Sequence, residues 1–287
     1  MSDIALPIAV PRTALRLRIG AAVAALLLLF GFISLVWTPY PVGSADIGAA
    51  LQGPGPAHWL GADQLGRDLL SSIMRGTLTS FVVSAVALAI GAIIGLPLGF
   101  AAARWPGPAD FAISGVGDFL LVFPALVLAI LLGAGIGPSF GNVMLAMGVV
   151  NIAVFMRVMR GGLRALMPLD YVAAARLAGT GEVETIRRHV LPALIPLIGA
   201  AALAQLAVGV LAEAGLSFVG LGAQPPATSL GLILRDGQSS ALQAPVQLVA
   251  PGLVIVAIVL ALNAASGGLR ETMPALLRRI GVSDGAA

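Results

Sequence analysis

One short segment of the sequence has the spacing of a hydrolase nucleophile. Residues 137–141 read GPSFG, which matches the G-x-S-x-G pattern of serine hydrolases with Ser139 at the nucleophile position. That chemistry requires a base beside the serine, and the only histidines are His58 and His189. The segment lies in a Gly/Pro-rich turn between two apolar runs, and we predict His189 on the opposite membrane face. We therefore interpret GPSFG as a turn and keep an intramembrane enzyme as an alternative.

The sequence lacks two residue types on which many active sites depend. It contains no cysteine, and all 16 of its basic residues are arginine. Without lysine there is no P-loop of the G-x-x-x-x-G-K-[ST] type, so we expect no ATP site of that kind. The missing cysteines exclude disulfides and thiolate chemistry, and two histidines are too few for a histidine metal cluster. We predict a non-catalytic chain without a cofactor or metal of its own.

The composition is typical of a membrane protein. Of the 287 residues, 59% are hydrophobic and 10% are charged, whereas a soluble domain is typically about 25% charged. Several apolar runs reach the roughly 20 residues that cross a bilayer. We predict an all-α membrane protein with six transmembrane helices near 19–38, 78–102, 116–135, 139–157, 194–218 and 246–266. After Gly66, apolar residues at helical spacing predict an interfacial helix that leads into the second span.

The arginines indicate how the chain is oriented. Six spans place both termini and the loops 103–115 and 158–193 on one side, and positively charged loops are typically cytoplasmic. We therefore predict that both termini are cytoplasmic and that the arginines set orientation rather than bind nucleic acid. That side holds 13 of the 16 arginines, namely Arg12, Arg16, Arg18, Arg104, Arg157, Arg160, Arg164, Arg176, Arg187, Arg188, Arg270, Arg278 and Arg279.

Polar residues within the predicted spans are candidates for a transport pathway or gate, because burying them in lipid is costly. These candidates are Asn151, Gln205, Glu213 and Ser217. Structural hydrogen bonds to neighbouring helices are the alternative. In the second span, GAIIGLPLG places three small residues on one helix face at intervals of four, a pattern that favours close helix packing in lipid.

The segment 171–192, YVAAARLAGTGEVETIRRHVLP, is unusually polar for its surroundings. We predict a helix from Tyr171 to Ala178, a break at residues 179–181 and a second helix from Glu182 to His189. Pro192 disfavours helix at the residue before it. Each short helix has an apolar stripe, and neither would be stable alone. The stripes therefore need a partner, which is either the ends of the spans or another protein.

This segment resembles the "EAA" loop of binding-protein-dependent ABC transporter permeases. That motif combines E-A-A, a glycine six residues after the Glu, and I-x-L-P. Here Ala174, Ala175, Gly179, Leu191 and Pro192 match it, and Ala173 stands where the family usually has Glu. The departure weakens one expected polar contact.

Three further stretches resemble the C-type membrane subunit of dipeptide, oligopeptide and nickel importers. HWLGADQLGRD at 58–68 is similar to H-x-L-G-T-D-x-x-G-R-D. GLSFVGLGAQPPATSLG at 215–231 is similar to L-S-F-L-G-L-G-x-Q-P-P-x-x-S-W-G, with Leu230 replacing Trp. LNAASGGLRE at 262–271 is similar to L-N-x-x-G-D-x-L-R-D, with Gly267 replacing Asp.

The resemblance implies a type I ABC importer permease fold in a prokaryotic cytoplasmic (inner) membrane. It implies a second homologous permease, one or two cytoplasmic ATPase subunits that carry ATP and Mg, and an extracytoplasmic substrate-binding protein. The hairpin would contact the ATPases and couple their closure to the spans. The residues expected to serve this coupling are Asp170, Tyr171, Ala174, Ala175, Arg176, Gly179, Arg187, Arg188 and Pro192.

We expect three parts along the chain. Residues 1–77 comprise an N-terminal arm, the first span and an outer amphipathic segment; residues 78–271 form the permease core with its loop at 168–192; and residues 272–287 form a cytoplasmic tail. Di- or oligopeptides are the expected substrates, with nickel complexes or opines as alternatives. An ion-coupled secondary transporter is the rival of a different class, and it would usually show inverted repeats or ionisable relays.

Overall fold

The computed structural model describes residues 11–122, 124–222 and 224–279, and every named element in them is helical. The first ten and last eight residues of the predicted arm and tail lie outside this range. The α-helices, in chain order, are α1 (Pro11–Ile33), α2 (Leu69–Arg104), α3 (Pro108–Val122), α4 (Ala125–Ile136), α5 (Phe140–Leu166), α6 (Asp170–Leu177), α7 (Glu182–Thr185), α8 (Leu191–Val219), α9 (Leu230–Gly237) and α10 (Val246–Arg279).

Five of these helical segments are long and apolar enough to cross a membrane, and a sixth span is counted if α3 and α4 are taken together. The five are formed by α1, α2, α5, α7 with α8, and α10. The all-α membrane class predicted from composition is confirmed. Residues 219–245 form no further span; they contain the short helix α9, which packs against α8 and α10.

The third predicted span, 116–135, is not one straight helix. It consists of α3 and α4, whose axes differ by 78°. Pro124 stands at the amino end of α4, with its φ of −59° already set for a helix start.

The second span begins earlier than its apolar composition suggests. Asp68 caps α2, because its carboxylate accepts a hydrogen bond from the backbone N–H of Ser71 at 2.8 Å. The helix then runs without interruption from Leu69 to Arg104. The residues predicted as a separate interfacial helix are therefore the first turns of α2, and their apolar side chains Leu69, Ile73 and Met74 are buried.

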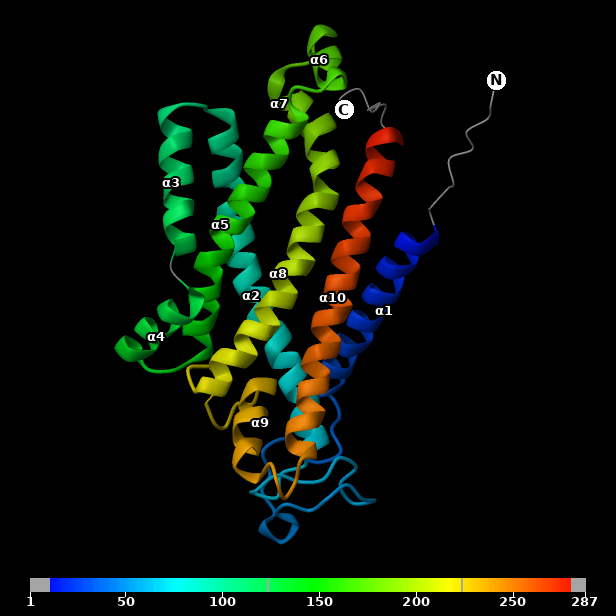
Figure 1. The fold of residues 1–287 in the computed structure, drawn as a ribbon, viewed down its shortest axis with the longest axis vertical. Coiled ribbons are helices and arrows are strands. Elements are labelled where there is room, and N and C mark those ends of the chain that lie inside the picture. Colours follow the sequence, from blue (N-terminus) through cyan, green and yellow to red (C-terminus); the bar gives the residue numbers. More distant parts are fainter. Residues whose placement is uncertain (1–10, 123, 223, 280–287) are drawn as a thin grey trace.

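The long helices form an elongated bundle with two different ends (Figure 1). The end that carries α6 and α7 is called the hairpin end here. The opposite end, called the α9 end, carries α9 and the segment between α1 and α2, which contains a short 3-10 helix at Ile47–Ala49. Among the described residues, α1 begins and α10 finishes toward the hairpin end, in agreement with the predicted topology (Figure 1).

The glycine face of α2 makes the most extensive helix contact of the bundle. A Cβ built on Gly91 would collide with Asn151 of α5. A Cβ built on Gly95 or Gly99 would collide with backbone carbonyl oxygens of α5. The small residues thus bring the two backbones together, as the spacing predicts. The packing interpretation of this glycine motif is confirmed.

Replacing Gly95 by Leu is therefore expected to force α2 and α5 apart. Overpacking a tight contact typically costs about 3 kcal/mol or less, and here the obstacle is backbone rather than a movable side chain. The measurement is the thermal midpoint of the purified chain in detergent. The control is Gly115→Leu in α3, where an added Cβ meets nothing within 4 Å. Equal thermal midpoints for the two variants would contradict this account of the packing.

Candidate functional site

The polar hairpin sits on the end of the bundle as two helical pieces joined by a tight turn. Helix α6 finishes at Leu177, and the backbone N–H of Thr180 then bonds to the carbonyl of Ala175 at 3.2 Å. Gly179 has φ +84°, a left-handed conformation that side chains with a Cβ rarely adopt. The break predicted at residues 179–181 is present, and the glycine is needed for its geometry.

The second half of the hairpin does not stop before Pro192. Residues 182–219 form one continuous span in which Ile186–Val190 has π-helical geometry. In this turn the N–H of Leu191 bonds to the carbonyl of Ile186, five residues back. The wider turn makes room for the proline ring and for its missing N–H. The prediction that helix is lost before Pro192 is therefore wrong.

Three apolar side chains of the hairpin are covered by its own bundle. Val172, Ile186 and Val190 are buried in one cluster with Leu163 of α5 and Leu194 of α8. These contacts join the hairpin to two long helices. The stripes were expected to need either the ends of the spans or another protein as a partner. For Val172, Ile186 and Val190, the partner is the ends of the spans.

Two large apolar side chains of the hairpin remain uncovered. Leu177 is 90% exposed and Val183 is 80% exposed. The predicted coupling residues around them are accessible as well. Asp170, Ala174, Arg176, Gly179, Arg187, Arg188 and Pro192 are exposed, and Tyr171 and Ala175 are partly exposed. The hairpin therefore presents a mixed apolar and charged surface away from the bundle.

Ion pairs hold the hairpin at a defined place. Arg104, the last residue of α2, contacts Glu182 of α7 at 2.7 Å. Glu184 pairs with both Arg187 and Arg188 within the same segment. The hydroxyl of Tyr171 is buried and has no hydrogen-bond partner in the described chain, and burial raises the pKa of that phenol. The Arg104–Glu182 pair connects the hairpin directly to α2.

The predicted pathway residues form two polar clusters between helices. Gln205 of α8 donates a hydrogen bond to the side-chain oxygen of Asn151 in α5 at 2.9 Å. Nearer the α9 end, Glu213 of α8 accepts bonds from Ser80 of α2 and from Ser217, each at 2.6 Å. Glu213 and Ser217 are fully buried; the bond from Ser80 joins α2 to α8, whereas the bond from Ser217 lies within α8. Their role in a pathway remains a prediction.

The nucleophile-like serine has a structural role. The Ser139 side chain caps α5 by accepting a hydrogen bond from the backbone N–H of Asn142 at 3.3 Å. His58 is engaged elsewhere, at 2.9 Å from Asp68, and His189 lies in the π-helical turn of the hairpin. The structure brings neither histidine to Ser139, which supports the interpretation of GPSFG as a turn.

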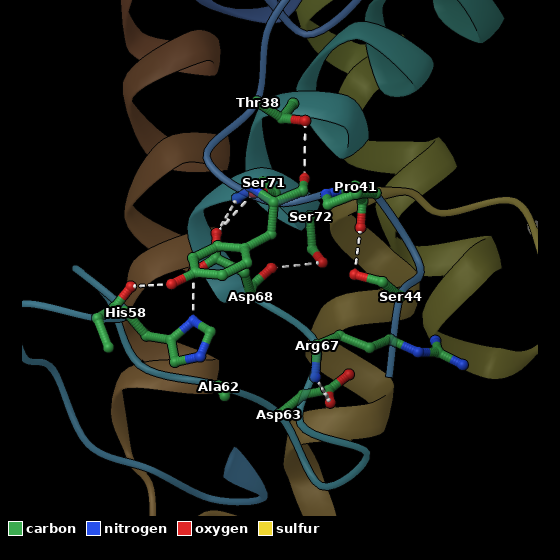
Figure 2. Close-up of polar contacts among 12 residues, drawn as sticks. Thr38, Pro41, Ser44, His58, Ala62, Asp63, Arg67, Asp68, Ser71 and Ser72 are labelled. Atoms are coloured by element: carbon green, nitrogen blue, oxygen red, sulfur yellow. Dashed lines mark hydrogen bonds and ion pairs between the residues drawn. The ribbon is translucent and has the colours of Figure 1, made fainter. Parts of the chain in front are cut away.

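The segment 58–68 forms a hydrogen-bond network around the buried Asp68 side chain at the α9 end (Figure 2). Asp68 binds the His58 ring at 2.9 Å through one carboxylate oxygen and the Ser71 hydroxyl at 2.7 Å through the other. Tyr40 covers the imidazole with its ring centroid at 4.6 Å and donates its hydroxyl to the carbonyl of Ala57 at 2.7 Å. The motif therefore fixes the loop to the start of α2.

The segment that contains α9 and the start of α10 form hydrogen bonds with the same segment, 58–68. Gln247 of α10 donates to the carbonyl of Ala62 at 3.0 Å, and Gln64 donates to the carbonyl of Asp236 at 2.7 Å. Burial raises the pKa of the Asp236 carboxyl, with Arg235 and Arg67 opposing that effect. Sequence reasoning identified both motifs only by resemblance and assigned them no contacts.

Comparison with known proteins supplies a family for this architecture. Residues 95–274 match the family model described as "binding-protein-dependent transport system inner membrane component". The chain is 35% identical over 268 residues to the glutathione transport system permease protein GsiD of Pectobacterium atrosepticum, covering 91% of this chain and 89% of that one. It is also 35% identical to the dipeptide transport system permease protein DppC of Alkalihalophilus pseudofirmus, over 78% of this chain and 73% of that one.

Solved structures share the fold at lower sequence identity. A chain of the MetNI methionine ABC transporter in an inward-facing conformation superposes with a TM-score of 0.54 at 19% identity, covering 73% of this chain and 96% of that one. A chain of an amino acid ABC transporter with histidines gives a TM-score of 0.54 at 20% identity, covering 72% and 93%.

Proposed function

Because the chain belongs to the family of binding-protein-dependent transport system inner membrane components, we propose that it forms half of the translocation pathway of a peptide importer. It is a membrane-spanning permease subunit of an ABC importer, and the all-helical bundle agrees with that role. The second half of the pathway would come from a homologous permease. Residues 78–271 are the proposed permease core.

The hairpin is the proposed contact with the ATPase subunits, which would carry ATP and Mg. The observation that carries this proposal is the exposure of Leu177 and Val183 on a hairpin whose Val172, Ile186 and Val190 are buried in the bundle. Because the hairpin packs against the ends of α5 and α8, a displacement of the hairpin would move those spans directly. Arg104 and Glu182 extend the same connection to α2.

The proposed orientation places the hairpin end in the cytoplasm and the α9 end outside. Thirteen arginines flank the spans on the hairpin side, and cytoplasmic loops are typically rich in arginine and lysine. The chain would lie in the cytoplasmic membrane of a prokaryote with both termini inside. An extracytoplasmic binding protein would then deliver the substrate to the α9 end.

Peptides are the proposed substrates, since the relatives named above are described as glutathione and dipeptide permeases. Nickel-complex or opine import remains the alternative within the family. An ion-coupled secondary transporter would need an ionisable relay, and Glu213 is the buried carboxylate available for one. Its hydrogen bonds with serines, among them Ser80 and Ser217, give it a structural role that needs no proton transfer.

The experiment that tests this proposal is affinity purification of the tagged chain from its own membrane, with every partner identified by mass spectrometry. We expect a second permease and one or two ATPases in stoichiometric amounts, and vesicles made from this complex should take up dipeptides. Recovery of the chain alone, active without any ATPase, would contradict the proposal.

A further inference from the structure

A sizeable cavity opens at the α9 end, away from the hairpin. It has a volume of about 590 Å³ and lies between the end of α1, the first turns of α2, the start of α5 and residues 226–228. Ligand pockets for small molecules typically measure about 300–1,000 Å³. Hydroxyl side chains from three separate segments, including Ser34, Thr79 and Thr228, line its wall.

Arg75 of α2 is the charged side chain on this wall. The residue is partly buried, and its guanidinium has no hydrogen-bond or ion-pair partner within the described residues. The Thr79 hydroxyl beside it donates to the backbone carbonyl of Arg75 and leaves the guanidinium unpaired. Arg75 also lines an adjoining apolar hollow of about 220 Å³ that includes Val82 and Met144.

Seven other arginines of the described chain are paired with acidic side chains, whereas Arg18, Arg67, Arg176, Arg235 and Arg270 have no such ion pair there, as Arg75 has none. Each of the seven contacts a carboxylate within 4 Å: Arg16, Arg104, Arg157, Arg160, Arg164, Arg187 and Arg188. No carboxylate is among the described residues that line the cavity of Arg75. An arginine held next to apolar surface without an acidic neighbour is ready for an anion from elsewhere.

Ser34 provides a second, independent observation. Its residue is 9% exposed, and its hydroxyl oxygen is buried without a hydrogen-bond partner in the described structure. A buried hydroxyl left unpaired is costly, and such groups are normally satisfied. Ser34 lines the same cavity as Arg75, and rotation about its Cα–Cβ bond would turn the buried hydroxyl toward a ligand bound there.

We propose that this cavity binds the carboxylate of the transported peptide, with Arg75 as the anion-binding residue and Ser34 as an additional hydrogen-bond donor. The planar guanidinium matches a carboxylate through two parallel N–H···O bonds. The apolar hollow next to it, with Val82 and Met144, accepts the adjacent side chain. This inference rests on the proposed peptide import and adds the chemical group that the α9 end recognises.

The first test compares a dipeptide with its C-terminal amide in ATP-driven uptake by the reconstituted complex. The binding protein imposes the same selection on every permease variant, so any change in the acid-to-amide ratio belongs to the permease. We expect Arg75→Gln to lower dipeptide uptake by about tenfold and to reduce the ratio, and Arg75→Lys to retain part of both. Arg235→Gln, an exposed arginine at the same end, should match the wild type.

The second test measures binding without the binding protein. The chain has no native cysteine, so Thr79→Cys introduces a single thiol into the cavity wall next to Arg75. Millimolar dialanine should slow modification of this thiol several-fold, and dialanine amide should not. Adding Arg75→Gln should remove the protection. Equal protection by acid and amide would overturn the inference.

The outcomes separate this inference from the proposed function. A wild-type complex that takes up no dipeptide overturns both. Intact dipeptide uptake with an unchanged acid-to-amide ratio in Arg75→Gln overturns only the carboxylate site. If Arg75→Gln instead releases the second permease and lowers uptake of both peptides equally, the arginine pairs with an acidic residue of that subunit, and the inference is wrong.

Discussion

Leu177→Asp is expected to abolish co-purification of the ATPase subunits while leaving the chain folded. Leu177 is 90% exposed, so the substitution disturbs no packing within the chain. In the complex it would bury a carboxylate in an apolar contact, and central interface residues of this kind typically contribute about 2 kcal/mol or more. That corresponds to a loss of affinity of roughly 30-fold. ATPase stoichiometry in the purified complex is the measurement.

Ile47→Asp is the matched control for this experiment. Ile47 is 84% exposed, but it lies in the segment between α1 and α2, at the α9 end. The same change in polarity there should leave the ATPases bound. If Leu177→Asp retained a full complement of ATPases, the hairpin would not be their docking surface.

Glu213→Ala is expected to cause the second large effect, a loss of stability of about 3 kcal/mol. The carboxylate is fully buried and accepts hydrogen bonds from Ser80 and Ser217, each at 2.6 Å. Removing it leaves two buried hydroxyls without that acceptor and creates a cavity between α2 and α8. Glu213→Gln keeps one oxygen acceptor and should cost about 1 kcal/mol. The thermal midpoint of the purified complex reports the difference.

The same pair of variants tests the role of Glu213 in transport. A carboxylate that only joins helices should be replaceable by the amide with ATP-driven uptake largely retained. A proton-coupling carboxylate could not be replaced in this way, because an amide does not titrate. A stable Glu213→Gln protein without uptake would therefore favour the ion-coupled alternative.

Local sequence signals predict much of the membrane architecture. Apolar runs of membrane-spanning length locate the long helices, and Gly91, Gly95 and Gly99 locate the tightest helix contact. These features follow from the composition of a segment and from the spacing of its residues, and both are visible in the sequence alone. The start of α2 was missed, because the cap at Asp68 and the apolar residues after it can equally begin a separate surface helix.

The errors share a physical cause, since they depend on tertiary neighbours. Pro124 breaks the third span, whereas Pro192 is absorbed by a π-helical turn, and no local signal separates the two cases. Likewise, Val172 and Leu177 are both apolar residues of α6, but one is 0% exposed and the other 90%. Only the position of α5 and α8 decides which of them is covered.

The cavity at the α9 end could not be predicted from sequence. Its unpaired groups, Ser34 and Arg75, come from separate elements, and neither belongs to a recognised motif. The family motif at 58–68 was recognisable, but the buried contact between His58 and Asp68 that gives it a structural role was not. Chain segments must be placed in space before such contacts become visible.

The energy source of uptake shows whether this chain is the permease of an ATP-driven importer. The purified complex is placed in proteoliposomes with its ligand-loaded binding protein at the α9 side, and labelled dipeptide uptake is measured. The expected result is uptake that requires ATP at the hairpin side and persists when proton and sodium gradients are dissipated. Uptake that proceeds without ATP and stops when either ion gradient collapses would contradict it.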